Sequence, residues 1–261
     1  ALSARKKPWK KALFLDCLLH EMHLTLFLRH RPNFSTVFLN AGAHVQHHYF
    51  LNSASELVAV RDNPEWYIAQ DEDPFKDMLI EYDEILGDIL GLTETEILVA
   101  TGLTQTPVKR SVFYYRLRDH ENFFADLDLP IVKISPRMTR DFLISCENEA
   151  DAKVVESTLA TITTSDGIQV FGEVDNRGSD LFVVLDYPYE IMNNTEILVG
   201  SRRIRFIESV VFVAVKNGEH SGRGFAYFSA GLKNYTPADR GHVSGLFSTI
   251  CKYFGVKEFG G

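Results

Sequence analysis

Three closely spaced histidines are the residues in this sequence most suited to metal chemistry. His44, His47 and His48 follow a short β-rich run at residues 35–40. If the segment is helical, positions i, i+3 and i+4 lie on one face, and neutral imidazole is a ligand that Zn²⁺ and other borderline transition metals accept. Alternatively, one histidine caps the strand end and the others pack against Tyr49 and Phe50. The spacing leaves both interpretations open.

Other histidines give weaker signals. His220 stands in a glycine-rich stretch, residues 216–224, which is expected to be a loop after a buried strand, where it is either functional or simply solvated. Asp16, His20 and His23 share one helix face, but the pattern is HxxH and not the HExxH of zinc proteases, so a polar stripe on a half-buried helix is favoured.

Several familiar site types are absent from the sequence. There is no GxGxxG fingerprint, no P-loop and no GxSxG elbow, so we expect no nucleotide cofactor and no serine-hydrolase site. His120 and His242 have neutral surroundings and no catalytic role is expected for them. A set of arginines could bind an anion, although such residues more often form solvated surface: Arg137, Arg140, Arg202, Arg203 and Arg205.

Composition narrows the class of protein. The chain has 261 residues, a net charge of −8 and 45% hydrophobic residues, which is typical of a globular protein and argues against nucleic-acid binding. Three cysteines far apart favour a reducing compartment over a disulfide scaffold. The apolar stretch 12–28 contains polar groups and the basic opening residues lack a signal-peptide core. We therefore expect a cytoplasmic protein that does not bind membranes.

The elements that would position the histidines alternate between helix and strand. Apolar spacing predicts helices over 13–29 and 73–90, and β-rich runs predict buried strands at 35–40, 96–100 and 209–216. This order predicts an α/β fold with a mainly parallel central sheet flanked by helices, formed by residues 1–134 and 201–261. A strand at 141–146, a helix at 149–162 and strands at 169–174 and 181–187 predict a small inserted α+β (βαββ) subdomain, residues 135–200.

The order of these segments resembles the C-terminal half of the alkaline phosphatase-like superfamily, in its type I phosphodiesterase and nucleotide pyrophosphatase branch. In that family a strand ending in Asn precedes an Asp-x-x-x-His metal motif and an aromatic pair. Here Asn40 ends the first run, then residues 43–47 or 44–48 occupy the place of the motif, before Tyr49 and Phe50. The family's Asp-His-Gly corresponds to Thr101-Gly102-Leu103, and its last metal histidine to His220 between Gly218 and Gly222.

The resemblance implies metal ligands but leaves several positions altered. The motif's Asp is replaced by Ala43 or His44, and the Asp-His pair by Thr101-Gly102. The family's N-terminal metal-binding Asp and its Ser or Thr nucleophile have no counterpart here. Two-metal phosphoryl transfer needs about six protein ligands, so the histidines would suffice for one metal only, which we expect to be zinc, with manganese or iron as alternatives.

Two functions follow from the resemblance. In the first, the chain is a metal-dependent hydrolase of small-molecule phosphate or sulfate esters, or its C-terminal portion, with His44, His47, His48 and His220 as metal ligands. Thr101 is the local hydroxyl to test as nucleophile, and the missing groups would come from a missing N-terminal half or a partner chain, with a homo-oligomer as a further arrangement. In the second, the protein is a catalytically inactive relative that binds or scaffolds. A third interpretation packs the histidines in the core.

Overall fold

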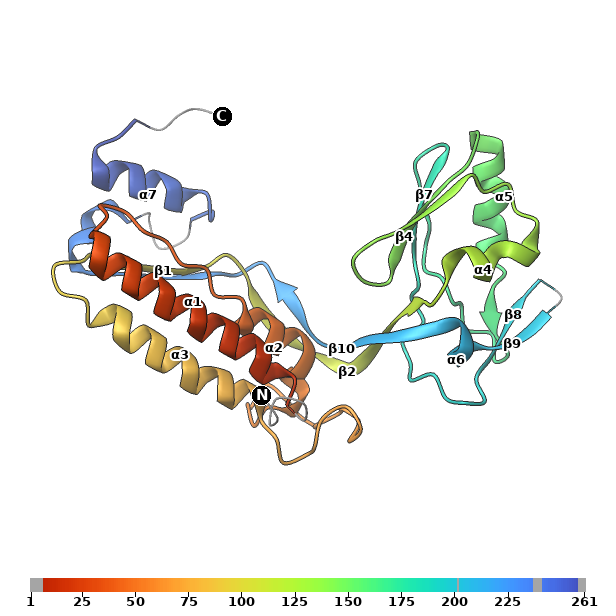
Figure 1. Cartoon of the computed structure of the whole chain (residues 1–261), viewed down its shortest axis with the longest axis horizontal. Coiled ribbons are helices and arrows are strands. Elements are labelled where there is room, and N and C mark those ends of the chain that lie inside the picture. Colours follow the sequence, from red (N-terminus) through yellow and green to blue (C-terminus); the bar gives the residue numbers. More distant parts are fainter. Residues whose placement is uncertain (1–6, 201, 237–240, 258–261) are drawn as a thin grey trace. The chain divides into compact units, whose positions relative to one another are not determined.

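The computed structural model describes residues 7–200, 202–236 and 241–257, and the chain divides into two units (Figure 1). Unit 1 comprises residues 1–109 and 217–261, and unit 2 comprises residues 110–216. The inserted subdomain expected at 135–200 lies within unit 2. Strands β2 (Thr104–Leu117) and β10 (Val210–Ser221) both continue across the unit boundaries and pair in a two-stranded sheet. Residues 1–6 lie outside the described residues. They include part of the basic segment on which the expectation about a signal peptide depends.

Unit 1 is mainly helical. Its helices are α1 (Trp9–His30), α2 (Ala41–Tyr49), α3 (Pro74–Leu90) and α7 (Gly245–Phe254), together with the 3-10 helices η2 (Phe50–Asn52) and η4 (Ala230–Tyr235). The Asp73 side chain accepts a hydrogen bond from the backbone N–H of Lys76, and this cap starts α3. Arg31, in the left-handed conformation, ends α1 by donating its N–H to the Phe27 carbonyl. The helices predicted at 13–29 and 73–90 are confirmed.

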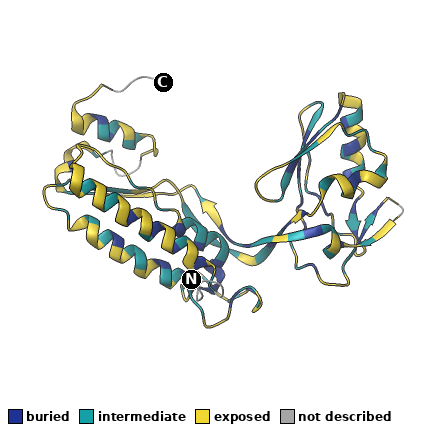
Figure 2. Cartoon of the chain, in the orientation of Figure 1, coloured by how far each residue is buried: buried dark blue, intermediate teal, exposed yellow. Residues whose placement is uncertain are grey.

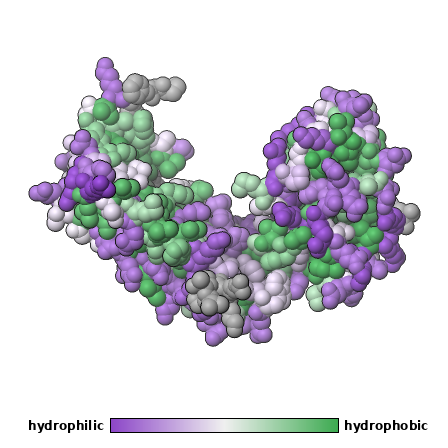
Figure 3. Space-filling view, in the orientation of Figure 1, coloured by the Kyte–Doolittle hydropathy of each residue, from purple (hydrophilic) through white to green (hydrophobic). Residues whose placement is uncertain are grey.

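The core of unit 1 lies between α1, α2 and α3. Buried residues from these helices and the following loop pack together there: Trp9, Leu13, Ala41, Val45, Tyr49, Ile68 and Met78. The outer face of α1 is also apolar, with exposed side chains Phe14, Leu15, Leu18, Leu19, Met22 and Leu26 (Figures 2 and 3). Within the described ranges, no helix combines the length and the apolar character needed to span a membrane.

Unit 2 is built from short antiparallel strands and helices. One sheet has the order β3 (Lys133–Pro136), β4 (Asp141–Ser145), β7 (Asp180–Val184), β6 (Asp175–Asn176), and a second the order β5 (Thr163–Thr164), β8 (Glu196–Val199), β9 (Arg202–Arg205). The helical elements are α4 (His120–Phe124), η3 (Ala125–Leu127), α5 (Glu149–Leu159) and α6 (Phe206–Ser209). Burial alternates along β4 and β7, as expected for a sheet with one face on a core. Phe142, Ile144, Leu181 and Leu159 are fully buried there.

The predicted mainly parallel central sheet is wrong. The paired strands for which a register is described are antiparallel, including β1 (Leu98–Thr101) with β11 (Phe225–Phe228). Residues 35–40 form no strand, and Phe38 within them is 77% exposed. The apolar run at 209–216 belongs to β10, whose sheet partner is β2. Continuous apolar runs are typical of parallel strands whose two faces are both covered by helices. Here the apolar run at 96–100 belongs largely to β1, which is half exposed, so the run did not indicate such a sheet.

A carboxylate from α1 and a hydroxyl from α3 start helix α2. The buried Asp16 side chain accepts hydrogen bonds from the backbone N–H groups of Asn40 and Ala41, at 3.2 and 2.7 Å. The Tyr82 hydroxyl donates to Asp16 at 2.8 Å and accepts from the N–H of Gly42 at 2.7 Å. The first N–H groups of a helix lack partners inside the helix, so these tertiary contacts replace a local cap. They fix where α2 begins.

Replacing Asp16 by Ala should destabilise unit 1. The backbone N–H groups of Asn40 and Ala41 would lose their acceptor, at a cost of about 1–3 kcal/mol. Both tryptophans, Trp9 and Trp66, belong to unit 1, so their fluorescence during urea unfolding measures this unit by itself. Glu21→Ala, which removes an exposed carboxylate of the same helix, is the matched control. Equal unfolding midpoints for Asp16→Ala and the wild-type protein would contradict the capping role.

Candidate functional site

Helix α2 places three histidine rings next to one another. The segment with His44, His47 and His48 is helical, as the metal interpretation required. Ring centroids of His44 and His48, one turn apart, lie 4.8 Å from each other, and those of His47 and His48 lie 6.2 Å apart. The Tyr49 ring contacts both His44 and His48 edge-on, at 6.2 and 6.4 Å. Both sequence interpretations therefore describe part of the arrangement, since the histidines cluster and also pack against Tyr49.

Strand β10 brings the fourth histidine to this helix. The His220 ring meets the His47 ring at a centroid distance of 4.7 Å and an interplanar angle of 84°. His220 is exposed and belongs to the strand, not to a loop as expected from its glycine-rich surroundings. We call His44, His47, His48 and His220 the histidine cluster; all four belong to unit 1.

Gly218 lets β10 come this close to α2. A Cβ atom at Gly218 would lie 2.6 Å from the carbonyl oxygen of Gln46 and 2.8 Å from Oε1 of Gln105. Any larger residue would therefore push the strand away from the helix. Gln105 also ties β2 to α2, because its Nε2 donates to the Ala43 carbonyl at 3.2 Å.

A buried amide network holds the same segment of β10 in place. Asn63 donates to Asn52 and to Asn217 at 2.9 and 2.6 Å, and Asn217 donates back to Asn63 at 2.8 Å. Oδ1 of Asn217 also accepts the backbone N–H of Leu51 at 2.9 Å. All three asparagines are buried, and buried amides are costly to leave unpaired. We call Asn52, Asn63 and Asn217 the asparagine network; it fixes the chain one residue before Gly218 and three before His220.

Burial and one backbone contact affect the protonation of His44 and His47. Burial lowers the pKa of His44, and the neighbouring His47 lowers it further, so His44 is neutral at pH 7. Nδ1 of His47 lies 3.4 Å from the Gly218 carbonyl oxygen, which can only accept a hydrogen bond. In the neutral ring that contact places the proton on Nδ1, so a hydrogen bond to the backbone sets the orientation of the ring.

The cluster is nevertheless not a finished metal site. Among the residues that the structure describes, no group of three or more His, Cys, Asp or Glu side chains is arranged to hold a metal ion. The His47 and His220 rings meet edge to face across the α2–β10 contact. The fit to a metal is therefore good in donor type and incomplete in geometry.

Thr101, the hydroxyl considered as a nucleophile, is held by backbone contacts elsewhere in unit 1. It ends β1 opposite Phe225, and its Oγ1 accepts the N–H of Phe225 at 3.0 Å. In the described part of the chain, no ring contact or hydrogen bond joins it to the histidine cluster. The structure thus brings the four histidines together and does not bring Thr101 to them.

The polar residues of α1 have structural roles. Asp16 caps α2, and the buried His20 is hydrogen bonded to Asp88 at 3.0 Å. His23 contacts the Ser35 hydroxyl at 2.8 Å. The sequence indicated neither the close contact of Gly218 with α2 nor the roles of Tyr82 and the asparagine network, because the partners of these residues lie far away along the chain.

The sequence matches no protein-family model, and neither the curated proteins nor the solved structures contain a significant match to it. The resemblance to the alkaline phosphatase-like superfamily therefore stays a prediction, carried by the short motifs alone.

Gly218→Ala should separate β10 from α2. The added methyl group would overlap the Gln46 carbonyl, and overpacking of this kind costs about 1–3 kcal/mol. We expect a lower free energy of unfolding for unit 1 by tryptophan fluorescence. Gly222→Ala is the control, because a Cβ there meets no atom within 4 Å. Equal stability of the two variants would show that β10 does not need glycine at position 218.

The stability of unit 1 should depend on the protonation of His44. Because its pKa is lowered in the folded state, the unfolded chain binds a proton there more readily, and protonation favours unfolding. The His44 contribution is present above pH 6.5, the ordinary histidine value, and is lost as the pH falls through 6.5 toward the lowered folded pKa. His44→Gln should flatten this slope in urea titrations between pH 7.5 and 5.5, while His242→Gln should not. An unchanged slope in His44→Gln would refute the assignment.

Proposed function

We propose that unit 1 binds one divalent transition-metal ion at the histidine cluster and that the protein uses it to bind and hydrolyse a small-molecule phosphate or sulfate ester. The observation that carries this proposal is the contact between His47 and His220, two imidazoles brought together from distant parts of the sequence. Support also comes from the lowered pKa of His44, which favours its neutral, metal-binding form, and from the Gly218 contact that orients the His47 ring.

The donor set favours zinc, with manganese and iron as alternatives. Imidazole nitrogen is a borderline donor that suits Zn²⁺, and structural or catalytic zinc takes three or four such ligands. His47 and His220 would supply the first two, and His44 or His48 the third after a change of rotamer. A metal held there would polarise the oxygen of a bound ester as a Lewis acid. We assign Thr101 no role in bond cleavage, because its Oγ1 already accepts a backbone hydrogen bond.

The engaged Thr101 hydroxyl favours a second candidate, a binding or scaffolding protein without hydrolytic activity. In that case the cluster would bind a metal and an anion without turnover. Both candidates share a small-molecule ester ligand, and neither requires a nucleic acid or a membrane. We also propose a cytoplasmic location, which agrees with the free thiols of Cys17, Cys146 and Cys251. A homo-oligomer and a separate N-terminal half remain the proposed partner arrangements.

Metal analysis distinguishes the proposal from a purely structural cluster. After incubation with Zn²⁺ and gel filtration, plasma mass spectrometry should find about one zinc per wild-type chain, and His220→Ala should lower the zinc affinity at least about tenfold, since removing even indirect ligand partners costs 10–100-fold. His242→Ala removes an exposed histidine bonded to Ser244 and should leave the zinc content unchanged. No retained zinc, or equal loss in both variants, would refute the metal site.

Turnover separates the two candidates. The zinc-loaded protein should cleave a chromogenic phosphodiester or sulfate ester, and the His220→Ala variant should not. Binding of zinc without any turnover would leave only the second candidate.

A further inference from the structure

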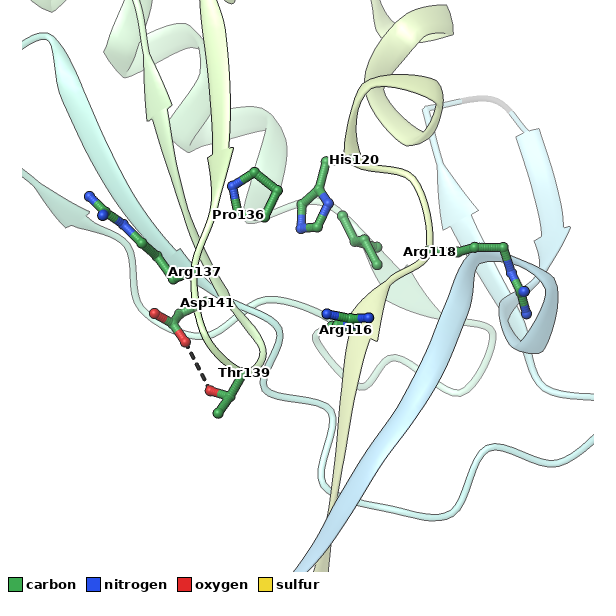
Figure 4. Close-up of a pocket in the computed structure, with 8 residues that line it drawn as sticks. Arg116, Arg118, His120, Pro136, Arg137, Thr139 and Asp141 are labelled. Atoms are coloured by element: carbon green, nitrogen blue, oxygen red, sulfur yellow. Dashed lines mark hydrogen bonds between the residues drawn. The ribbon is translucent and has the colours of Figure 1, made fainter.

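A small cavity in unit 2 is lined by basic side chains. It has a volume of about 190 Å³ and lies between the end of β2 and the turn that joins β3 to β4 (Figure 4). Its lining residues are Arg116, Leu117, Arg118, His120, Pro136, Arg137, Thr139 and Asp141. The lining contains three arginines and one carboxylate in a chain whose net charge is −8, so positive charge exceeds negative charge around this cavity.

Two of these arginines lack internal partners. In the described part of the chain, the guanidinium groups of Arg116 and Arg137 make no hydrogen bond or ion pair. Arg118 donates to the carbonyl oxygens of Glu208 and Val210, at 3.3 and 3.1 Å. Among the described residues, Asp141 forms no ion pair with either group, and its carboxylate accepts a hydrogen bond from the Thr139 hydroxyl at 2.9 Å (Figure 4).

In a neighbouring cavity of the same unit, two of the arginines form ion pairs. That cavity, of about 300 Å³, is also lined by arginines, including Arg202 and Arg205. There Arg202 is paired with Asp126 and Arg205 with Glu208. Among the described residues, Arg116 and Arg137 thus differ from the two paired arginines of this second cavity.

His120 adds a second polar group to the cavity. Its ring packs edge-on against the buried Phe142, with centroids 4.9 Å apart, and it projects toward the side of the cavity where Arg116 lies (Figure 4). Burial lowers the pKa of His120; Asp119 raises it, and Arg116 lowers it again. The neutral ring can donate one N–H, so Arg116 and His120 offer donors to the same space, while Arg137 extends away at the other side (Figure 4).

We propose that this cavity binds a tetrahedral oxyanion, the phosphate or sulfate group of a small molecule, through Arg116 and His120, with Arg137 in the lining adding positive charge. Planar guanidinium groups bind phosphate and sulfate oxygens in pairs. The volume is below the roughly 300–1,000 Å³ of pockets that enclose drug-sized ligands, so the site would hold the anionic group and leave the rest of the molecule outside. This site belongs to unit 2 and is independent of the histidine cluster.

Calorimetric titration with inorganic phosphate and with sulfate tests the proposal. The whole chain, treated with a chelator to remove metal, is titrated at constant ionic strength. We expect saturable binding at one site, weakened about tenfold or more in Arg116→Gln, because hydrogen bonds to charged groups contribute strongly to binding. Arg137→Gln should weaken binding by a smaller factor. The relative affinity of the two anions identifies which kind of ester the site takes.

Two controls separate a built site from general charge attraction and from the metal site. Arg203→Gln makes the same charge change on β9, outside both cavities, and should alter the affinity less than twofold. His220→Ala should bind phosphate like the wild-type protein. No saturable binding to the wild-type chain, or equal weakening in Arg116→Gln and Arg203→Gln, would overturn the proposal. Loss of binding in His220→Ala alone would assign the anion to the histidine cluster and overturn it as well.

Discussion

Hydrogen bonds between three buried asparagines determine where the second part of unit 1 joins the first. Asn217 is the first residue of unit 1 after the chain returns from unit 2, and it bonds at once to Asn63 and to the backbone of Leu51. Amide groups that are fully removed from water tolerate few arrangements, because each unpaired donor or acceptor costs free energy. The asparagine network therefore fixes the position of β10 along α2, and Gly218 permits the close contact between them.

The histidine cluster is a consequence of this register and of the start of α2. Asp16 and Tyr82 fix the first turn of α2, which sets the directions of the histidines one and two turns later. The asparagine network fixes β10, which sets the position of His220. The carbonyl of Gly218 then orients the His47 ring. Contacts remote from the imidazoles thus determine where the rings lie, and similar outer contacts orient the histidines of known metal sites.

Local sequence patterns predicted where helices form better than they predicted which faces are buried and which strands pair. Helix α3 was predictable because its apolar spacing, Asp73 cap and Gly91 end agree. The spacing of Leu15, Leu18 and Met22 correctly predicted α1, but these residues lie on its exposed face, while Trp9 and Asp16 are buried. Strand pairing was mispredicted because apolar runs such as 35–40 and 96–100 do not say which strands pair or what covers them.

The candidate sites divide in the same way. The i, i+3, i+4 spacing of His44, His47 and His48 was sufficient to place three rings together once the segment is helical. The contact with His220 was expected only through the family resemblance, since nothing local links residues so far apart. Arg116 and His120 were missed because their shared cavity exists only after β2 meets the β3–β4 turn. The sequence alone does not show which arginines lack an ion-pair partner, because the pairing depends on the fold.

The most direct test of the central claim, that the cluster binds a metal through histidine nitrogens, is X-ray absorption at the zinc edge of the protein loaded with one equivalent of Zn²⁺. We expect nitrogen neighbours at about 2.0–2.1 Å with the outer-shell scattering of imidazole rings, and loss of one ring from the spectrum of His220→Ala. A first shell of oxygen only, or identical spectra for the two proteins, would contradict it.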